Sequence, residues 1–272
     1  MTTFRTTVGS ADPATANADT TPVVALLHSL GTDARMWSAQ ESALGGTYRV
    51  VTPESRGHGQ KPWKGPLHLN DWVEDLRGTL TAVTEEPVHL VGLSMGGVQA
   101  LAYAQRYPGD VASLVLADTF AGLDRDVALG KISDIQQTVQ AIGMASYAVS
   151  YLRSTLLTDV GDDAYEHLRS AIAGVGAEAY LASAETCFRA DLSDGLGTVA
   201  VPTLVLVGDA DRKTPLALAE ALKRGIPDAK LEVIPSAGHL SNVESPRAFN
   251  ELVLGFIASV SPSNRPSRMR RS

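Results

Sequence analysis

Cysteine is almost absent from this 272-residue chain, and long apolar runs are absent altogether. The single cysteine, Cys187, excludes an intrachain disulfide and any zinc or iron–sulfur site built from several thiolates. No apolar stretch reaches the roughly 18 residues that a membrane-spanning helix needs. The sequence therefore predicts no membrane partner and no metal site.

Positive charge is also scarce, since 23 Lys and Arg face 30 Asp and Glu for a net charge of −7. Proteins that bind nucleic acid usually carry the opposite excess, so nucleic acid is not an expected partner. The exception is segment 263–272, which ends in RPSRMRRS and is expected to be a disordered basic tail, with an anion contact as the alternative. Residues 1–21 lack the apolar run of a signal peptide, so the expected location is the cytoplasm.

Short apolar runs alternate with segments of helical period along most of the chain. Six runs read as buried strands: Pro22–His28, Tyr48–Pro53, Pro87–Leu93, Val111–Ala117, Val201–Val207 and Lys230–Ile234. Helical spacing of apolar residues is clearest over 69–83, 98–107, 216–224 and 249–257. Strands that are apolar on both faces and separated by helices predict an α/β fold with a mostly parallel sheet covered on both sides.

One stretch interrupts this alternation. Residues 122–196 contain no β-rich run, and their apolar residues recur at spacings of three and four. We interpret them as an inserted cap of about four short helices. The predicted organisation is a core domain made of residues 1–121 and 197–262, with this cap between its two parts.

The sharpest local motif is Gly92-Leu93-Ser94-Met95-Gly96, which lies between a predicted strand and a predicted helix. That context is typical of a nucleophile elbow, in which glycines two residues away let the chain fold tightly around an exposed serine. The helix that begins there points its free amides toward developing negative charge. The spacing does not fit a G-x-G-x-x-G phosphate loop, so Ser94 is the predicted nucleophile.

A serine nucleophile needs a base, and the base needs an orienting acid. His239 follows the last strand in Pro235-Ser236-Ala237-Gly238 and is the predicted base, while His28 and His58 are expected to form structural hydrogen bonds. Asp211 follows the Val201–Val207 strand and is the predicted acid. Its rivals are Asp209, two residues away, and Asp118, which also follows a strand.

The predicted reaction also needs two backbone donors for an oxyanion. The residue after the nucleophile, Met95, supplies one amide, and the loop after the first buried strand supplies the other, from Leu30. The chemistry of such a site requires no cofactor and no metal.

These motifs resemble the α/β-hydrolase superfamily over about residues 22–260. The resemblance rests on GLSMGG, LLHSLGTDARMW, SRGHG, VGDADRKTP and PSAGHLSNVESP. Within the superfamily, HSLGTDARMW and HLSNVESP are most similar to the 3-oxoadipate enol-lactonase group. The resemblance implies that Ser94, Asp211 and His239 are the catalytic residues, with Leu30 and Met95 as oxyanion donors. It further implies a small-molecule ester or lactone as substrate.

The predicted cap should form the roof of the substrate pocket. Its candidate contacts, together with Leu30, are Met144, Tyr147, Tyr151 and Phe188. Lys61 and Lys64, which flank Trp63, are further candidates for attracting an anionic substrate, although a solvated loop is the simpler interpretation.

Other functions fit the same motifs. Similar sites hydrolyse carbon–carbon bonds in ring-cleavage products, or act as cofactor-free haloperoxidases and perhydrolases. From a different class, the fold can serve as a ligand receptor or an inactive scaffold. The sequence does not decide the oligomeric state, and a homodimer stays open.

Overall fold

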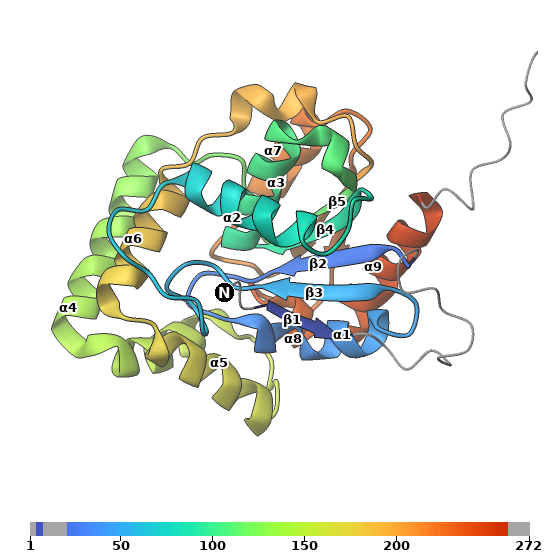
Figure 1. The fold of residues 1–272 in the computed structure, drawn as a ribbon. Helices are drawn as coiled ribbons and strands as arrows, with labels where there is room; N and C mark the ends of the chain where they lie inside the picture. Colours follow the sequence, from blue (N-terminus) through green and yellow to red (C-terminus); the bar gives the residue numbers. More distant parts are fainter. Residues whose placement is uncertain (1–3, 8–20, 261–272) are drawn as a thin grey trace, which may run out of the picture.

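The computed structural model describes residues 4–7 and 21–260, so the predicted basic tail lies outside the described residues. Its centre is a seven-stranded sheet of order β1-β3-β2-β4-β5-β6-β7 (Figure 1). Strand β1 runs antiparallel to β3, and all other neighbours are parallel. The strands are β1 Phe4–Thr7, β2 Val23–Leu27, β3 Arg49–Pro53, β4 Val88–Leu93, β5 Val111–Ala117, β6 Thr203–Gly208 and β7 Lys230–Ile234. The predicted α/β class is confirmed.

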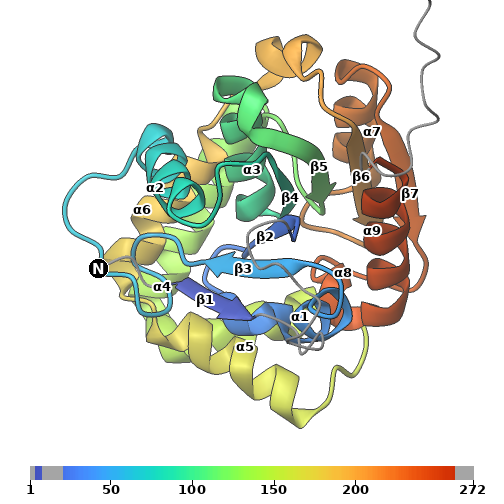
Figure 2. The same cartoon turned by 45° about the vertical axis from the view of Figure 1, so that its right-hand side comes forward.

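Helices cover both faces of this sheet (Figure 2). The α-helices are α1 Ser38–Leu44, α2 Leu69–Thr81, α3 Met95–Arg106, α4 Arg125–Thr155, α5 Asp162–Gly174, α6 Ala177–Phe188, α7 Leu216–Gly225, α8 Ser241–Glu244 and α9 Pro246–Val260. Short 3-10 turns occur at η1 Ala34–Trp37, η2 Pro108–Asp110 and η3 Ser193–Thr198. Helices α2, α3 and α7 pack on one face, and α1 and α9 pack on the other.

Strand β2 shows why the central strands read as continuous apolar runs. Val24 and Leu26 belong to the core on the α1–α9 side, whereas Val23, Ala25 and Leu27 belong to the core on the α2–α3 side. All five side chains are buried. A strand covered on both faces gains from an apolar residue at every position, so the pattern carries no alternation.

The N-terminal strand was not predicted. β1 pairs with β3 along Phe4–Thr7, and the sequence FRTT carries neither a run of apolar residues nor a clear alternation. An antiparallel edge strand is specified mainly by backbone pairing with its neighbour, which leaves little signal in the sequence.

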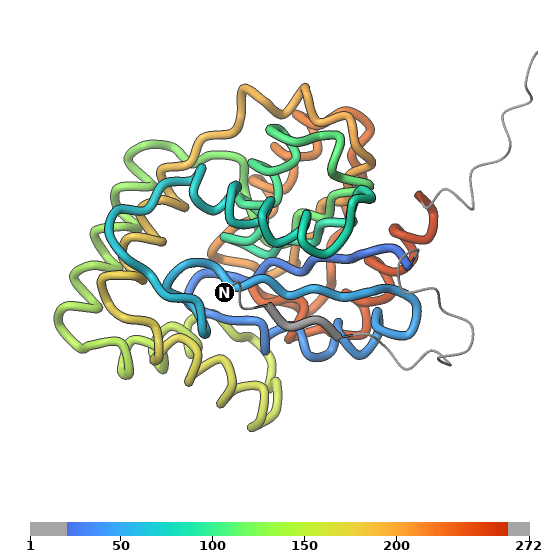
Figure 3. Tube along the Cα trace, in the orientation of Figure 1, coloured from blue at the N-terminus to red at the C-terminus, as the bar shows by residue number. Residues whose placement is uncertain are grey.

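The interruption after β5 holds α4, α5 and α6, which lie together at one end of the molecule, and η3, which packs against α3 and α7 (Figure 3). About four short helices were expected, but the first two form one long α4 with a kink at Gly143, where φ is +72°. Only glycine adopts this left-handed conformation readily, so the kink position follows from the residue. Among the helices within residues 21–260, none combines the length and the apolar character needed to cross a bilayer.

Candidate active site

Ser94 lies in a strained turn between β4 and α3, with φ at +55° and ψ at −115°. Its backbone is held from both sides, because its N–H donates to the carbonyl of Ala117 at 2.9 Å and its carbonyl accepts the Thr119 hydroxyl at 2.7 Å. Strain of this kind persists only where surrounding contacts enforce it and is often found at functional sites.

The two glycines of the motif are required by close backbone approach. A Cβ on Gly92 would lie 2.2 Å from the Gly96 carbonyl oxygen, and a Cβ on Gly96 would lie 2.0 Å from the Leu27 carbonyl oxygen. Neither oxygen could move away from such a Cβ without a shift of the backbone. The close backbone contacts that the glycine spacing predicted are therefore present at both positions in the structure.

His239 reaches Ser94 from the loop that follows β7. This loop crosses the end of β6, where a Cβ on Gly208 would lie 2.4 Å from the carbonyl oxygens of Ala237 and Gly238. The ring is buried, and its Nε2 lies 3.0 Å from the Ser94 Oγ. A glycine at the end of β6 thus lets a histidine from the sheet edge approach the end of β4, near the centre of the sheet.

Asp211 contacts the other side of the same ring. Its Oδ2 lies 2.9 Å from the His239 Nδ1, and because a carboxylate only accepts, Nδ1 carries the proton and Nε2 is free to accept from Ser94. The Asp211 Oδ1 accepts the backbone N–H groups of Lys213 and Thr214 at 2.7 and 3.0 Å. Burial alone would raise the pKa of this carboxyl, but the charge and hydrogen bonds of His239 and Thr214 outweigh it and hold the pKa below its usual value.

Among the recorded hydrogen bonds, neither rival acid is bonded to the His239 ring. Asp209 is exposed and has no recorded side-chain hydrogen bond within the described part of the chain. Asp118 is fully buried, accepts the Gly208 N–H at 2.9 Å and accepts the Ser241 hydroxyl. Burial, followed by the nearby charge of Asp211, raises its pKa to about 7. Asp118 therefore braces the loop that carries His239, and Asp211 is the carboxylate bonded to the ring.

The loop after β2 borders the elbow because β2 and β4 are neighbours in the sheet. The Gly31 N–H donates to the His58 Nε2 at 3.0 Å, and the Thr32 N–H donates to the Ser29 carbonyl at 3.1 Å. Within residues 21–260 no protein acceptor is recorded for the amides of Leu30 and Met95. Both amides are therefore free to donate, one from the residue after Ser94 and the other from the loop beside the elbow.

His28 and His58 form structural hydrogen bonds. The His28 Nδ1–H donates to the Ser29 carbonyl at 2.8 Å, and its Nε2 accepts the Ser55 N–H at 3.0 Å. Burial lowers the pKa of both rings, to about 3 for His58. Both imidazoles are thus held neutral, in the tautomer that ties the loop after β3 to the loop after β2.

A cavity of about 240 Å³ opens onto Ser94 and His239. Apolar and aromatic side chains make up much of its wall, with charged groups among them. The remaining lining residues are Leu30, Lys131, Asp134, Ile135, Tyr147, Tyr151, Tyr180, Cys187, Phe188, Lys213 and Thr214.

Four of the five predicted contacts, Leu30, Tyr147, Tyr151 and Phe188, line this cavity. Met144 does not line it; its partly buried side chain packs against the apolar core.

The two lysines suggested for anion attraction are not among the cavity lining. Lys61 pairs with Asp75 at 3.0 Å, in a different, narrower pocket between the loop after β3 and α2. Lys64 is exposed.

Seven lining residues were missed by the sequence interpretation: Lys131, Asp134, Ile135, Tyr180, Cys187, Lys213 and Thr214. The Thr214 hydroxyl donates to the Asp211 Oδ2 and lies 3.3 Å from the His239 Nδ1. The Tyr180 hydroxyl lies 3.1 Å from that of Tyr147, and Lys213 follows the acid by two positions. Thr214 and Lys213 could have been predicted from their positions shortly after Asp211. The position of Tyr180 in the cavity wall depends instead on how α6 packs.

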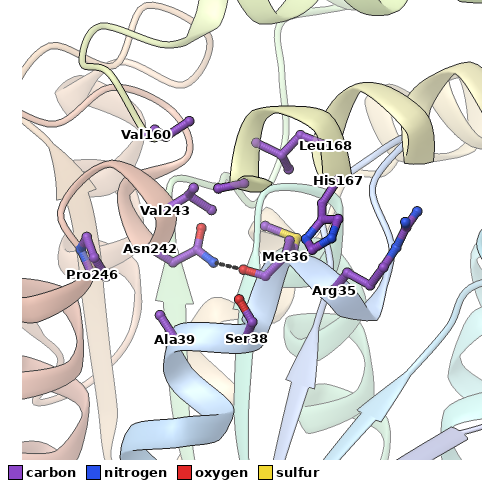
Figure 4. Close-up of a pocket in the computed structure, with 11 residues that line it drawn as sticks. Arg35, Met36, Ser38, Ala39, Val160, His167, Leu168, Asn242, Val243 and Pro246 are labelled. Carbon is purple, nitrogen blue, oxygen red and sulfur yellow. Dashed lines mark hydrogen bonds between the residues drawn. The ribbon is translucent and has the colours of Figure 1, made fainter. Parts of the chain in front are cut away.

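A second cavity, of about 180 Å³, lies between α5 and the segments η1–α1 and α8–α9 (Figure 4). Asn242 and Met36 meet at its wall, where the Asn242 side-chain amide donates to the Met36 carbonyl at 3.0 Å. Ser94, Asp211 and His239 do not line it. In the described part of the chain, no group of three His, Cys, Asp or Glu side chains is arranged to hold a metal ion.

An open, mostly parallel sheet, a helical insertion after β5 and a serine on the turn between β4 and α3 define the α/β-hydrolase fold. The chain belongs to the alpha/beta hydrolase family, and its match to that family spans residues 24–252.

Individual relatives agree with this assignment. The chain is 31% identical to 3-oxoadipate enol-lactonase 1 of Acinetobacter baylyi, over 88% of this chain and 90% of that protein. It is 32% identical to a pimeloyl-[acyl-carrier protein] methyl ester esterase of Aromatoleum aromaticum, over 83% and 94%. The crystal structure of the enol-lactonase from Burkholderia xenovorans superimposes with a TM-score of 0.82 at 26% identity, covering 94% of this chain and 96% of that one. The predicted resemblance is confirmed.

Proposed function

We propose that the protein is a serine hydrolase that cleaves a carboxylic ester or a lactone of a small molecule. The observation that carries the proposal is the hydrogen-bonded series Ser94 Oγ–His239–Asp211, with contacts of 3.0 and 2.9 Å, at the wall of a cavity of about 240 Å³. Similarity to a lactonase and to a methyl ester esterase, both above 30% identity, supports ester-bond chemistry.

In the first step the Ser94 Oγ attacks the substrate carbonyl carbon while the His239 Nε2 takes the hydroxyl proton. The tautomer required for this, with the proton on Nδ1, is the one that Asp211 enforces by accepting it. Asp211 also stabilises the imidazolium that forms. Its low pKa keeps it ionised throughout.

The tetrahedral oxyanion then lies against the amides of Leu30 and Met95. Each such donor contributes roughly 2.7–4 kcal/mol to transition-state stabilisation in comparable sites. The Met95 amide is the first of α3, so the helix dipole adds to its effect.

Collapse of the intermediate transfers the His239 proton to the leaving oxygen and leaves an acyl-serine. Water, activated by the same imidazole, hydrolyses the acyl-enzyme in the second half of the reaction. For a lactone the leaving alcohol remains covalently attached to the acyl chain, so hydrolysis of the acyl-enzyme releases a single hydroxy acid. The segment α4–α6 acts as the cap, because Tyr147, Tyr151 and Phe188 come from it and line the cavity.

The test is a panel of small lactones and 4-nitrophenyl esters of graded acyl length, run against the wild type and Ser94→Ala. We expect turnover of the shortest members by the wild type and a loss of about 10⁴-fold or more in the variant. Thermal unfolding of both proteins provides the folding control. Equal hydrolysis by wild type and variant, or none by either, would reject the proposal.

A further inference from the structure

Two ammonium groups lie in the wall of the cavity that contains Ser94, and neither forms an ion pair with a carboxylate in the part of the chain that the structure describes. Lys131 comes from α4, and Lys213 comes from the loop after β6. The Lys131 Nζ donates to the Lys213 carbonyl at 3.3 Å, and the Lys213 Nζ donates to the Ser154 hydroxyl at 3.2 Å. No ion pair within 4.0 Å is recorded for either lysine among the described residues.

Both lysines lie beside aromatic rings, and neither has a directly bonded carboxylate among the described residues. The Lys131 Nζ lies 5.9 Å from the ring centre of Phe188, and the Lys213 Nζ lies 5.2 Å from that of Tyr151. Both side chains are partly buried. Burial lowers the pKa of Lys213 and the charge of Lys131 lowers it further, while the charge of Asp211 acts in the opposite direction but does not outweigh them.

The nearby carboxylates do not neutralise this pair. Asp134, which also lines the cavity, is exposed and is not recorded in an ion pair with either lysine. Asp211 is occupied by the His239 ring, the Thr214 hydroxyl and two backbone amides. Lys61 provides the contrast, since it has a carboxylate at 3.0 Å.

We infer that Lys131 and Lys213 form an anion subsite and that the natural substrate carries a negatively charged group beside the bond that is cleaved. This inference rests on the proposed ester or lactone hydrolysis at Ser94. An anion bound between the two lysines would offset their mutual repulsion and give both ammonium groups a directly bonded counter-charge. Because both lysines and Ser94 line one cavity of about 240 Å³, the charged group and the carbonyl belong to the same small molecule.

The experiment compares two matched substrates, 4-nitrophenyl pentanoate and mono-4-nitrophenyl glutarate, whose acyl chains differ by a terminal methyl or carboxylate. The readout is the ratio of kcat/KM for the charged ester to that for the neutral ester at low ionic strength. We expect the wild type to favour the charged ester, and Lys213→Met and Lys131→Met each to reduce the ratio by about tenfold. Lys64→Met, which removes an exposed lysine outside the cavity lining, should leave the ratio unchanged.

A third ester, with a phosphonate at the end of the same acyl chain, identifies which anion the two lysines prefer. Preference for either anionic ester over the methyl-terminated ester supports the inference. Turnover of the neutral ester with a wild-type ratio of one or less for both anions would overturn the inference and leave the proposed function standing. A ratio that falls equally in the Lys64→Met control would also overturn it. Absence of turnover for all three esters would instead reject the proposed function.

Discussion

The imidazole Nε2 of His58 accepts the backbone N–H of Gly31 at 3.0 Å. On its other side the ring donates from Nδ1 to the carbonyl of Arg56 at 3.1 Å. A buried neutral histidine from the loop after β3 thereby fixes the loop after β2 and occupies the amide next to Leu30. Preorganisation of the proposed oxyanion donor thus depends on a side chain that has no contact with Ser94 among its recorded hydrogen bonds.

Replacing His58 should therefore lower catalysis through the loop. His58→Ala removes the acceptor for the Gly31 amide, and we expect kcat for a neutral ester to fall by about tenfold, less than the loss of an oxyanion donor itself. His58→Gln, whose amide oxygen can accept the same N–H, should lose distinctly less. Steady-state kinetics on both variants, with circular dichroism to check folding, measures the difference; equal kcat values for the two variants would contradict the argument.

The free energy of unfolding should fall at acid pH because of the His58 imidazole. Burial depresses the pKa of His58 from 6.5 to about 3 in the folded protein, so the unfolded chain binds the proton first as the pH falls. The stabilising contribution is complete above pH 6.5 and is lost progressively as the pH drops toward 3, by up to about 1.4 kcal/mol per pH unit. Urea unfolding of the wild type and His58→Gln at several pH values isolates this contribution. The variant should show the shallower pH dependence, and parallel curves would exclude His58 as its source.

The two buried carboxylates beside His239 should differ sharply in function. Asp211→Asn removes the acceptor that sets the imidazole tautomer, and we expect kcat to fall by about 10⁴-fold. Asp118→Asn can still accept the Gly208 N–H and can donate to the Ser241 hydroxyl, so its loss should stay within about tenfold. Ester kinetics on the two variants compares them directly. A larger loss in Asp118→Asn would identify Asp118, rather than Asp211, as the orienting acid.

The elbow glycine should be intolerant of even one methyl group. A Cβ at Gly96 would meet the Leu27 carbonyl oxygen at 2.0 Å, so Gly96→Ala should destabilise the protein by about 3 kcal/mol or prevent folding. Gly255 in α9 is the matched control, because a Cβ there has no neighbour within 4 Å. Gly255→Ala should stabilise by roughly 0.5–1 kcal/mol. Thermal unfolding of the pair, or soluble yield if Gly96→Ala does not fold, gives the comparison.

The parts of the molecule that were predictable have local causes. The central strands are buried on both faces, so Val24 to Leu27 could only be apolar, and the glycines around Ser94 reflect a steric limit within one turn. The residues that follow strands β4, β6 and β7 converge because parallel strands end at one edge. Ser94, Asp211 and His239 could be chosen on that basis.

The parts that were missed depend on packing between distant segments. Strand β1 is specified by pairing with β3 rather than by its own composition. Met144 and Tyr180 both lie on helices of the segment after β5, and only the packing of those helices directs Tyr180, and not Met144, into the cavity. Lys61 was suggested as an anion contact, but its ammonium group pairs with Asp75 of α2, a contact that depends on how α2 packs against the loop after β3.

The most direct test of the account is covalent labelling of the folded protein with a fluorophosphonate, followed by intact-mass measurement and peptide mapping. We predict one adduct per chain, on Ser94, and a marked slowing of labelling in His239→Ala and Asp211→Asn. Thermal unfolding shows that each variant is folded. A folded wild-type protein that stays unlabelled, or that carries the adduct on another residue, would contradict the account.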